Sequence, residues 1–286
     1  MKNRTGTGPE AKQSASHAGS WKRILMTLLM PAFFMLRSVL PVQAAGASDG
    51  IAVAAPLSGT YSVSQGDGGI VITLDNYQGD YVIFYKKYTC AVQVIVNGTC
   101  SVGRIHVSGA NTALTVEPAS ALVTGSITQY DGSLLITNYG VIGADDSADI
   151  GCKAPLVIVN AGIINAGDIC AQDGSISIGG GVLNARSLSA GKGILADHAA
   201  LRLTNDTAYT MLAEDGDIDL TASTVTASAS TYAMYTVTGK IVLDGCMLSG
   251  PSGSSVLGYK AGQAVAYDDS DLGYRVRSRT AEIRLK

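Results

Sequence analysis

Residues 209–227 read YTMLAEDGDIDLTASTVTA, and residues 232–250 read YAMYTVTGKIVLDGCMLSG. The second segment repeats six positions of the first at a constant offset of 23 residues: Tyr209 and Tyr232, Met211 and Met234, Gly216 and Gly239, Ile218 and Ile241, Leu220 and Leu243, and Val225 and Leu248. Repeats of about 20 to 50 residues are typical of solenoids, propellers and similar arrays. The sequence therefore predicts a repetitive fold.

The same repeat extends toward the N-terminus with a slightly shorter step. The pattern Asn-x-Gly-x-Ile starts at Asn138 and returns 22 residues later at Asn160. Two further series have a step of 21 or twice 21 residues, namely the leucines Leu114, Leu135 and Leu156 and the Asp-Gly pairs that begin at Asp131, Asp173 and Asp215. We expect the members of each series to occupy equivalent positions on successive coils.

Each repeat contains short runs typical of β-strands. They lie at residues 134–138, 156–160, 175–179, 201–205 and 218–222, are rich in β-branched residues and are bounded by Gly, Asn, Asp or Ser. Between residues 46 and 286 no window has the apolar spacing of a helical repeat, and the motifs of leucine-rich repeats and propeller blades are absent. The sequence predicts an all-β fold, a single-stranded parallel β-helix of about 21–23 residues per coil, right-handed by precedent.

Composition agrees with stacked coils. Apolar residues make up 47% of the chain and charged residues only 15%, against about a quarter in an average domain. Inward side chains of successive coils would form apolar columns, which leaves few places for charge. At the turns, Asn138, Asn160 and Asn205 are candidates for a ladder of side-chain hydrogen bonds.

The N-terminus has the pattern of a secretory signal. Residues 2–23 are polar and basic, residues 24–36 are an apolar run, and Val42-Gln43-Ala44 offers small residues for cleavage after Ala44. An uncleaved anchor is the alternative. The predicted organisation is a signal peptide at 1–44, a cap and first coils at 45–100, regular coils at 101–260 and a cap or tail at 261–286, with the mature protein secreted or associated with the cell surface.

Five cysteines fit an exported chain only loosely. Cys90 with Cys100 and Cys152 with Cys170 are possible disulfides, and Cys246 is left over. Small buried residues in a stacked core are an equally good interpretation of all five. The three histidines have no ligand-like spacing, so the sequence predicts no metal site and no cofactor.

The repeat phrases GILAD at residues 193–197, ALRLTN at 200–205 and AEDGDIDLT at 213–221 resemble those of secreted bacterial parallel β-helix proteins. The resemblance covers about residues 131–250 and includes the carbohydrate-binding-domain group of right-handed β-helices. It implies extracellular sugar binding or surface display without a known catalytic centre, and no binding motif carries over residue by residue.

Tyrosines are the candidate carbohydrate-binding residues. Tyr209 and Tyr232 are one repeat apart, Tyr235 is close to them in sequence, and Tyr259 follows about one turn later. A row of tyrosines at coil spacing can pack against the C–H faces of sugar rings along a glycan chain. The same row is also a common structural ladder within β-helices.

Carboxylates leave an enzymatic alternative open. Asp145, Asp146 and Asp149 form the richest acidic cluster, with Lys153 nearby, and β-helix lyases or glycoside hydrolases use acids in a groove. Asp215, Asp217 and Asp219 alternate and would form a carboxylate row. Solvated acids at strand ends are the simpler account of both groups.

Other functions are disfavoured. The net charge of −3 gives no basic field for nucleic acid, and no nucleotide-binding or serine-hydrolase motif is present. The sequence predicts a non-enzymatic extracellular protein that binds a polysaccharide or a host or cell-surface glycan, or acts as an adhesin, without membrane contact once the signal is cleaved. A polysaccharide lyase or glycoside hydrolase is the alternative, and a structural spacer without ligand is the second.

Overall fold

A computed structural model describes residues 50–66, 69–84, 90–108, 111–143, 148–205, 209–229, 232–249, 257–258 and 274–277, all within the unit Leu40–Lys286. The predicted signal peptide, Tyr259 and most of the predicted tail lie outside these residues. The described ranges contain 25 strands and no helix. They accordingly hold no helical segment able to cross a membrane.

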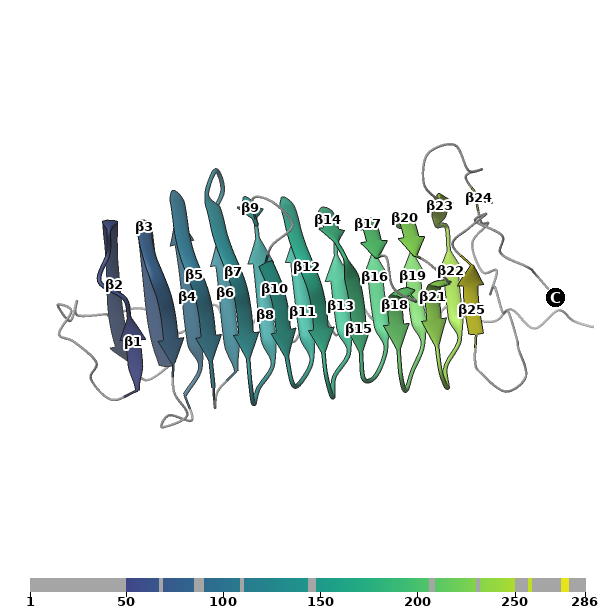
Figure 1. Ribbon diagram of the computed structural model, residues 1–286, viewed down its shortest axis with the longest axis horizontal. Coiled ribbons are helices and arrows are strands. Elements are labelled where there is room, and N and C mark those ends of the chain that lie inside the picture. Colours follow the sequence, from purple (N-terminus) through teal and green to yellow (C-terminus); the bar gives the residue numbers. More distant parts are fainter. Residues whose placement is uncertain are drawn as a thin grey trace, which may run out of the picture. The chain divides into compact units, whose positions relative to one another are not determined.

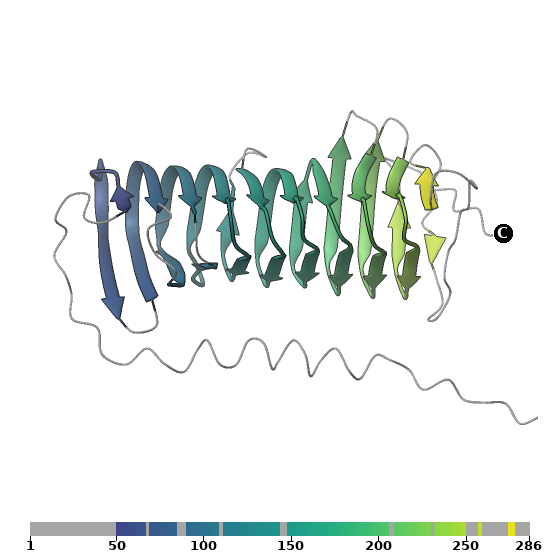
Figure 2. The same ribbon diagram turned by 90° about the horizontal axis from the view of Figure 1, so that it is seen from below.

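The chain forms a parallel β-solenoid of about 7 turns with coils of about 22 residues, which confirms the predicted fold (Figures 1 and 2). Each coil contributes strands to three faces. Face 1 contains the first part of β3 (Gly69–Phe84), followed by β4 (Val92–Asn97), β6 (Thr112–Val116), β8 (Leu134–Asn138), β11 (Leu156–Asn160), β13 (Ile176–Gly179), β16 (Ile194–Asp197), β19 (Ile218–Thr221) and β22 (Ile241–Asp244).

Faces 2 and 3 share several long strands. The first halves of β5 (Thr99–Val107), β7 (Ala121–Gln129) and β12 (Ile163–Ala171) belong to face 2 and the second halves to face 3. Face 2 also contains β9 (Val141–Ile142), β14 (Val182–Ala185), β17 (Ala200–Asn205), β20 (Thr224–Ala229) and β23 (Met247–Ser249). Face 3 also contains the end of β3, β10 (Ala148–Cys152), β15 (Ser187–Ala190), β18 (Tyr209–Ala213) and β21 (Tyr232–Thr236).

Close contact between successive coils explains the glycines at the bend between faces 2 and 3. A Cβ atom on Gly103 would lie 2.6 Å from the carbonyl oxygen of Asp80, and one on Gly125 would lie 2.9 Å from that of Gly103. Glycine is therefore the residue that lets these long strands bend while the coils remain one strand spacing apart.

Antiparallel strands lie at both ends of the solenoid. β1 (Ile51–Val53) and β2 (Ser58–Gly66) pair with β3, whereas β24 (Leu257–Gly258) pairs with β23 and β25 (Tyr274–Arg277) pairs with β21. Antiparallel end strands occupy edges that would otherwise offer backbone groups to another chain.

The core consists of side-chain columns that run from coil to coil. One column on face 1 contains Ile70, Val92, Thr112, Leu134, Leu156, Ile176, Ile194, Ile218 and Ile241, each at most 5% exposed. Burying each aliphatic side chain contributes about 1.5–3 kcal/mol. The predicted stacking of Ile218 on Ile241 is confirmed.

The leucine series with a step of 21 was wrong. Leu134 pairs with Leu156, and Leu114 pairs with Ile136. Leu135 therefore lies on the outer surface, where it is half-buried. By contrast, the Asp-Gly pairs at Asp131, Asp173 and Asp215 all lie at the corner between faces 3 and 1, as expected.

The predicted asparagine ladder is correct for two of its three members. Asn138 donates from Nδ2 to Oδ1 of Asn160 at 2.9 Å, and Asn160 donates to the carbonyl of Val182 at 2.9 Å. Asn205 does not belong to it, because it lies on face 2 and donates to the carbonyl of Tyr209 at 2.8 Å. A second ladder, in which Asn184 donates to Asn165 at 2.7 Å, was not foreseen.

All five cysteines have free thiols in the structure, so neither considered disulfide is present. Gly151, not Cys152, pairs with Cys170, which places the side chains of Cys152 and Cys170 on opposite sides of the sheet. Burial raises the pKa of the Cys152 thiol to about 12. Cys100, Cys152 and Cys246 act as small core residues.

Candidate functional site

The three faces differ in the side chains that they present outward. Face 2 carries an apolar column of Ala121, Val141, Ile163, Val182 and Ala200. The outer surface of face 3 instead combines aromatic and charged side chains, each of which is followed in sequence by a buried residue: Tyr81, Arg104, His106, Asp149, Asp168 and Tyr235. Aromatic surface with a few polar groups is typical of ligand sites, so face 3 holds the candidate site.

The tyrosine pair lies on β18 and β21. Tyr209 and Tyr232 are in backbone register, as predicted. The ring that contacts Tyr209 is that of Tyr235, stacked at a centroid distance of 5.8 Å and an interplanar angle of 28°. The side chain of Tyr232 and the whole of Tyr259 lie outside the described residues. Of the four predicted tyrosines, the structure thus brings the rings of two together.

The layer beneath these rings is firmly packed. Met211 and Met234 are in register and are 0% and 1% exposed, so they belong to the core rather than to a partly buried surface. Thr210 is fully buried and donates its hydroxyl to the carbonyl of Ala233 at 2.6 Å. Core packing and this hydrogen bond hold the backbone under the tyrosine pair in one conformation.

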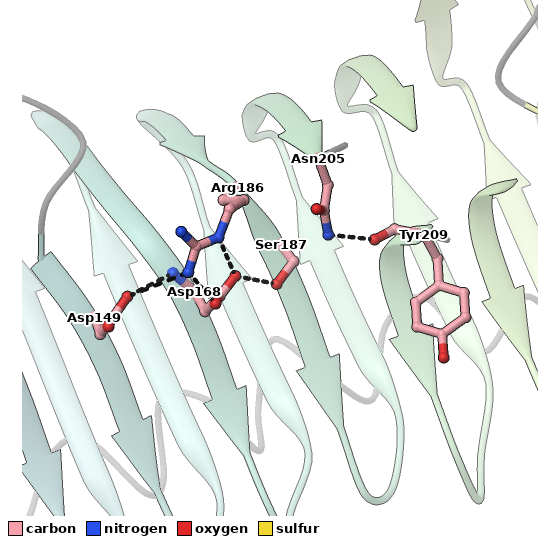
Figure 3. Close-up of polar contacts among 6 residues, drawn as sticks. All are labelled: Asp149, Asp168, Arg186, Ser187, Asn205 and Tyr209. Atoms are coloured by element: carbon pink, nitrogen blue, oxygen red, sulfur yellow. Dashed lines mark hydrogen bonds and ion pairs between the residues drawn. The ribbon is translucent and has the colours of Figure 1, made fainter. Parts of the chain in front are cut away.

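A charged network lies on the same face (Figure 3). Arg186 donates from Nε to Oδ1 of Asp168 at 2.9 Å and makes a second bond from Nη2 to Oδ2. Ser187 donates to Asp168 at 2.6 Å, and Asp149 accepts the backbone N–H of Asp168 at 2.9 Å. The hydrogen bond from Arg186 is the main reason why the pKa of Asp168 lies below its ordinary value.

A basic aromatic cluster lies toward β3 on face 3. The Arg104 guanidinium carbon is 5.9 Å from the centre of the Tyr81 ring. His106 meets the ring of Tyr130 edge to face at 5.7 Å, and its Nε2 lies 3.2 Å from Oγ of Ser126. Burial, and secondarily the charge of Arg104, lowers the pKa of His106.

Sequence reasoning missed the basic aromatic cluster. Its members come from three coils, and Tyr81 meets Arg104 because these residues pair in register between β3 and β5. The offset of 23 residues between them was the available signal, but the two residues are of different types and do not read as a repeat.

The acidic groups considered for catalysis are dispersed. Asp145 and Asp146 lie outside the described residues, and Asp149 belongs to the network around Arg186. The row of Asp215, Asp217 and Asp219 was wrong, because only Asp219 lies in a strand.

Each of these three aspartates has its own surroundings. Asp215 binds Lys192 and Thr238, and Asp217 accepts the backbone N–H of Lys240. Asp219 lies on face 1, where burial, and then the charges of Asp217 and Asp244, raise its pKa. In the described ranges, no three His, Cys, Asp or Glu side chains are arranged to hold a metal ion.

The chain matches no protein-family model, no curated protein and no solved structure.

Proposed function

We propose that the protein is a secreted, non-enzymatic β-solenoid that binds carbohydrate through the outer surface of face 3. The observation that carries the proposal is the stacked pair of Tyr209 and Tyr235 on the same face as the Asp168, Arg186 and Ser187 network. Aromatic rings offer surface to the C–H faces of sugars, and the neighbouring polar groups can bond sugar hydroxyls.

The arrangement suits an extended ligand. The strands β10, β12, β15, β18 and β21 follow one another on face 3 and carry the network at one end and the tyrosine pair at the other. At about 4.8 Å per strand, the four steps span about 19 Å. A glycan chain aligned with the solenoid axis would meet both groups.

The site is also held in place before any ligand arrives. Every strand that contributes to it is hydrogen-bonded to a strand on each side. All of these pairings are parallel apart from that of β21 with β25, which is antiparallel. A preorganised surface loses little conformational entropy on binding, so modest contacts suffice for measurable affinity.

Residues 1–44 support an extracellular location, since their basic, apolar and small-residue segments follow the order of a secretory signal. Outside the cell the ligand would be a polysaccharide or a cell-surface glycan. The protein would then be secreted or retained on the surface without a membrane span of its own.

Asp168 on face 3 is unsuited to the role of acid catalyst in glycoside hydrolysis. A glycoside hydrolase needs a carboxylic acid whose pKa is raised, so that it can donate a proton. Asp168 has the opposite shift, because Arg186 stabilises its ionised form. A lyase or hydrolase remains the alternative function, and a spacer without ligand is the second alternative.

A glycan array with the mature protein tests the proposal. Tyr209→Ala should weaken binding about tenfold, because it removes one ring of the stacked pair. The matched control is Tyr139→Ala, since Tyr139 is 48% exposed and follows β8 on face 1. Both variants should keep the strand signal in circular dichroism.

Three results would contradict the proposal. If the two variants weaken glycan binding equally, the tyrosine pair is not the binding site. Release of reducing or unsaturated ends from a bound polysaccharide would support the enzymatic alternative. An array without any binding would support the spacer.

A further inference from the structure

We propose that Arg104, His106 and Tyr130 form a subsite for an anionic sugar substituent, so that the ligand class is an acidic glycan carrying carboxylate or sulfate groups. This inference rests on the proposed carbohydrate binding and adds the chemical class of the ligand. Arg104 and His106 lie on β5, and Tyr130 directly follows β7, at the end of face 3.

Arg104 is an exposed cation without a carboxylate partner in the described residues. Two other basic side chains near face 3 are already neutralised, since Arg186 pairs with Asp168 and Lys192 pairs with Asp215. The Arg104 side chain instead lies over the Tyr81 ring, which orients the guanidinium without consuming its charge. Guanidinium groups in this position can bind carboxylate or sulfate through two parallel hydrogen bonds.

His106 and Tyr130 lie beside Arg104 on the outer surface of face 3 and enlarge the subsite. His106 lies two residues after Arg104 and points to the same outer side, because Ile105 between them is buried. Tyr130 is 51% exposed, and its ring is fixed by the edge contact with His106. The subsite therefore offers a charge, an imidazole and an aromatic surface side by side.

The preference for an anionic group is confined to the end of face 3 that carries Arg104. Five strand steps separate β5 from β18, by way of β7, β10, β12 and β15, which corresponds to about 24 Å. Between them lies the network of Asp149 and Asp168 with Arg186, in which two carboxylates face one guanidinium. An acidic glycan would thus place its charged substituent at Arg104 and a less charged part near Tyr209.

Calorimetric titration with three octasaccharides tests the inference: an oligogalacturonate, a heparin-derived sulfated fragment and neutral maltooctaose. The wild-type protein should bind at least one acidic probe more tightly than the neutral one. Arg104→Gln should weaken that acidic binding about tenfold or more and leave any neutral binding unchanged, because only a charge-assisted contact is lost.

The matched control is Arg202→Gln. Arg202 is exposed on face 2, makes no ion pair in the described part of the chain, and loses the same charge on substitution. It should leave all three affinities unchanged. The oligogalacturonate carries carboxylates alone, whereas the heparin fragment carries both carboxylates and sulfates, so tighter binding of the heparin fragment would indicate a contribution from sulfate.

Several outcomes overturn the inference. If both arginine variants weaken the binding of acidic probes equally, the binding reflects the overall charge of the protein and not a subsite at Arg104. If Arg104→Gln has no effect while Tyr209→Ala still weakens binding, the subsite is wrong and the proposed carbohydrate binding stands. If none of the three probes binds and the array is also empty, both proposals fail.

Discussion

Asn160 illustrates at the residue scale how this core accepts polar side chains. It is 4% exposed, accepts from Asn138 and from the backbone N–H of Gly162, and donates to the carbonyl of Val182. Each of these hydrogen bonds lies within the coil of Asn160 or joins it to an adjacent coil. A buried amide is tolerated because both its oxygen and its nitrogen make hydrogen bonds.

Replacing Asn160 with Ala should therefore destabilise the protein by about 2–3 kcal/mol, because the partners of its amide are left unsatisfied in the core. Urea denaturation followed by circular dichroism measures the effect. Asn97→Ala is the control, since Asn97 is the half-buried last residue of β4 and its side chain makes no hydrogen bond in the described structure. This substitution should cost less than about 0.5 kcal/mol. Similar decreases in the free energy of unfolding of both variants would show that the asparagine ladder makes no specific contribution to stability.

At the element scale, each strand is short and its orientation depends on register. Coil length varies, since equivalent residues are 18 apart from Ile176 to Ile194 and 24 apart from Ile194 to Ile218. The corners between strands absorb these differences. A shift of one residue, however, moves every side chain of a strand to the other side of the sheet.

This sensitivity to register predicts opposite behaviour for two neighbouring leucines of β8. Leu134 is 1% exposed in the core column, whereas Leu135 is half-buried on the outer surface. Leu134→Ala should cost about 2–5 kcal/mol through lost burial and a cavity. Leu135→Ala should cost less than about 1 kcal/mol, because its neighbours on the outer surface are open to water.

Denaturation midpoints and slopes of the two leucine variants give the comparison directly. A larger loss for Leu135→Ala would mean that the series with a step of 21 was the true register and that the pairing of Leu134 with Leu156 is wrong.

The same physics explains which parts of the structure were predictable from sequence. The repeat at Tyr209 and Tyr232 and the Asp-Gly corners are visible because equivalent positions keep the same residue types. Leu135 was misplaced because the offset of 21 residues is one short of the coil length at this point, where Leu114 pairs with Ile136. Asn205 was misplaced because it ends a strand of face 2, whereas Asn138 and Asn160 end strands of face 1. Arg104 and Tyr81 are in contact because β3 and β5 pair in register. The two residues are of different types, so no repeated residue in the sequence indicates this contact.

At the scale of the whole molecule, the solenoid behaves as a series of nearest-neighbour contacts. Each parallel strand inside the solenoid forms hydrogen bonds with a strand of the preceding coil and a strand of the following coil. The side chains of the core columns likewise stack on those of the adjacent coils. The stability of such a fold is approximately a sum over coils and their interfaces. Removing one complete coil should consequently shorten the protein without changing the fold of the remainder.

Residues 134–155 are a suitable coil, because Leu134 and Leu156 occupy equivalent positions. Their removal places β6 against β11 with the core positions still aligned, as Thr112 and Leu114 would meet Leu156 and Ile158. The deletion keeps the tyrosine pair and the cluster around Arg104, and it brings the two closer by one strand step of about 4.8 Å. Asp149 is lost from the network, while Asp168, Arg186 and Ser187 stay.

We expect this deletion variant to fold, to keep the strand signal in circular dichroism and to melt cooperatively at a lower temperature than the full chain. Deletion of residues 134–144, about half a coil, is the control, because it places a strand of one face against a different face and breaks every core column beyond it. That variant should fail to fold. A stable half-coil variant together with an unfolded whole-coil variant would contradict the coil as the repeating unit of stability, because only the whole-coil deletion conserves the alignment of the columns.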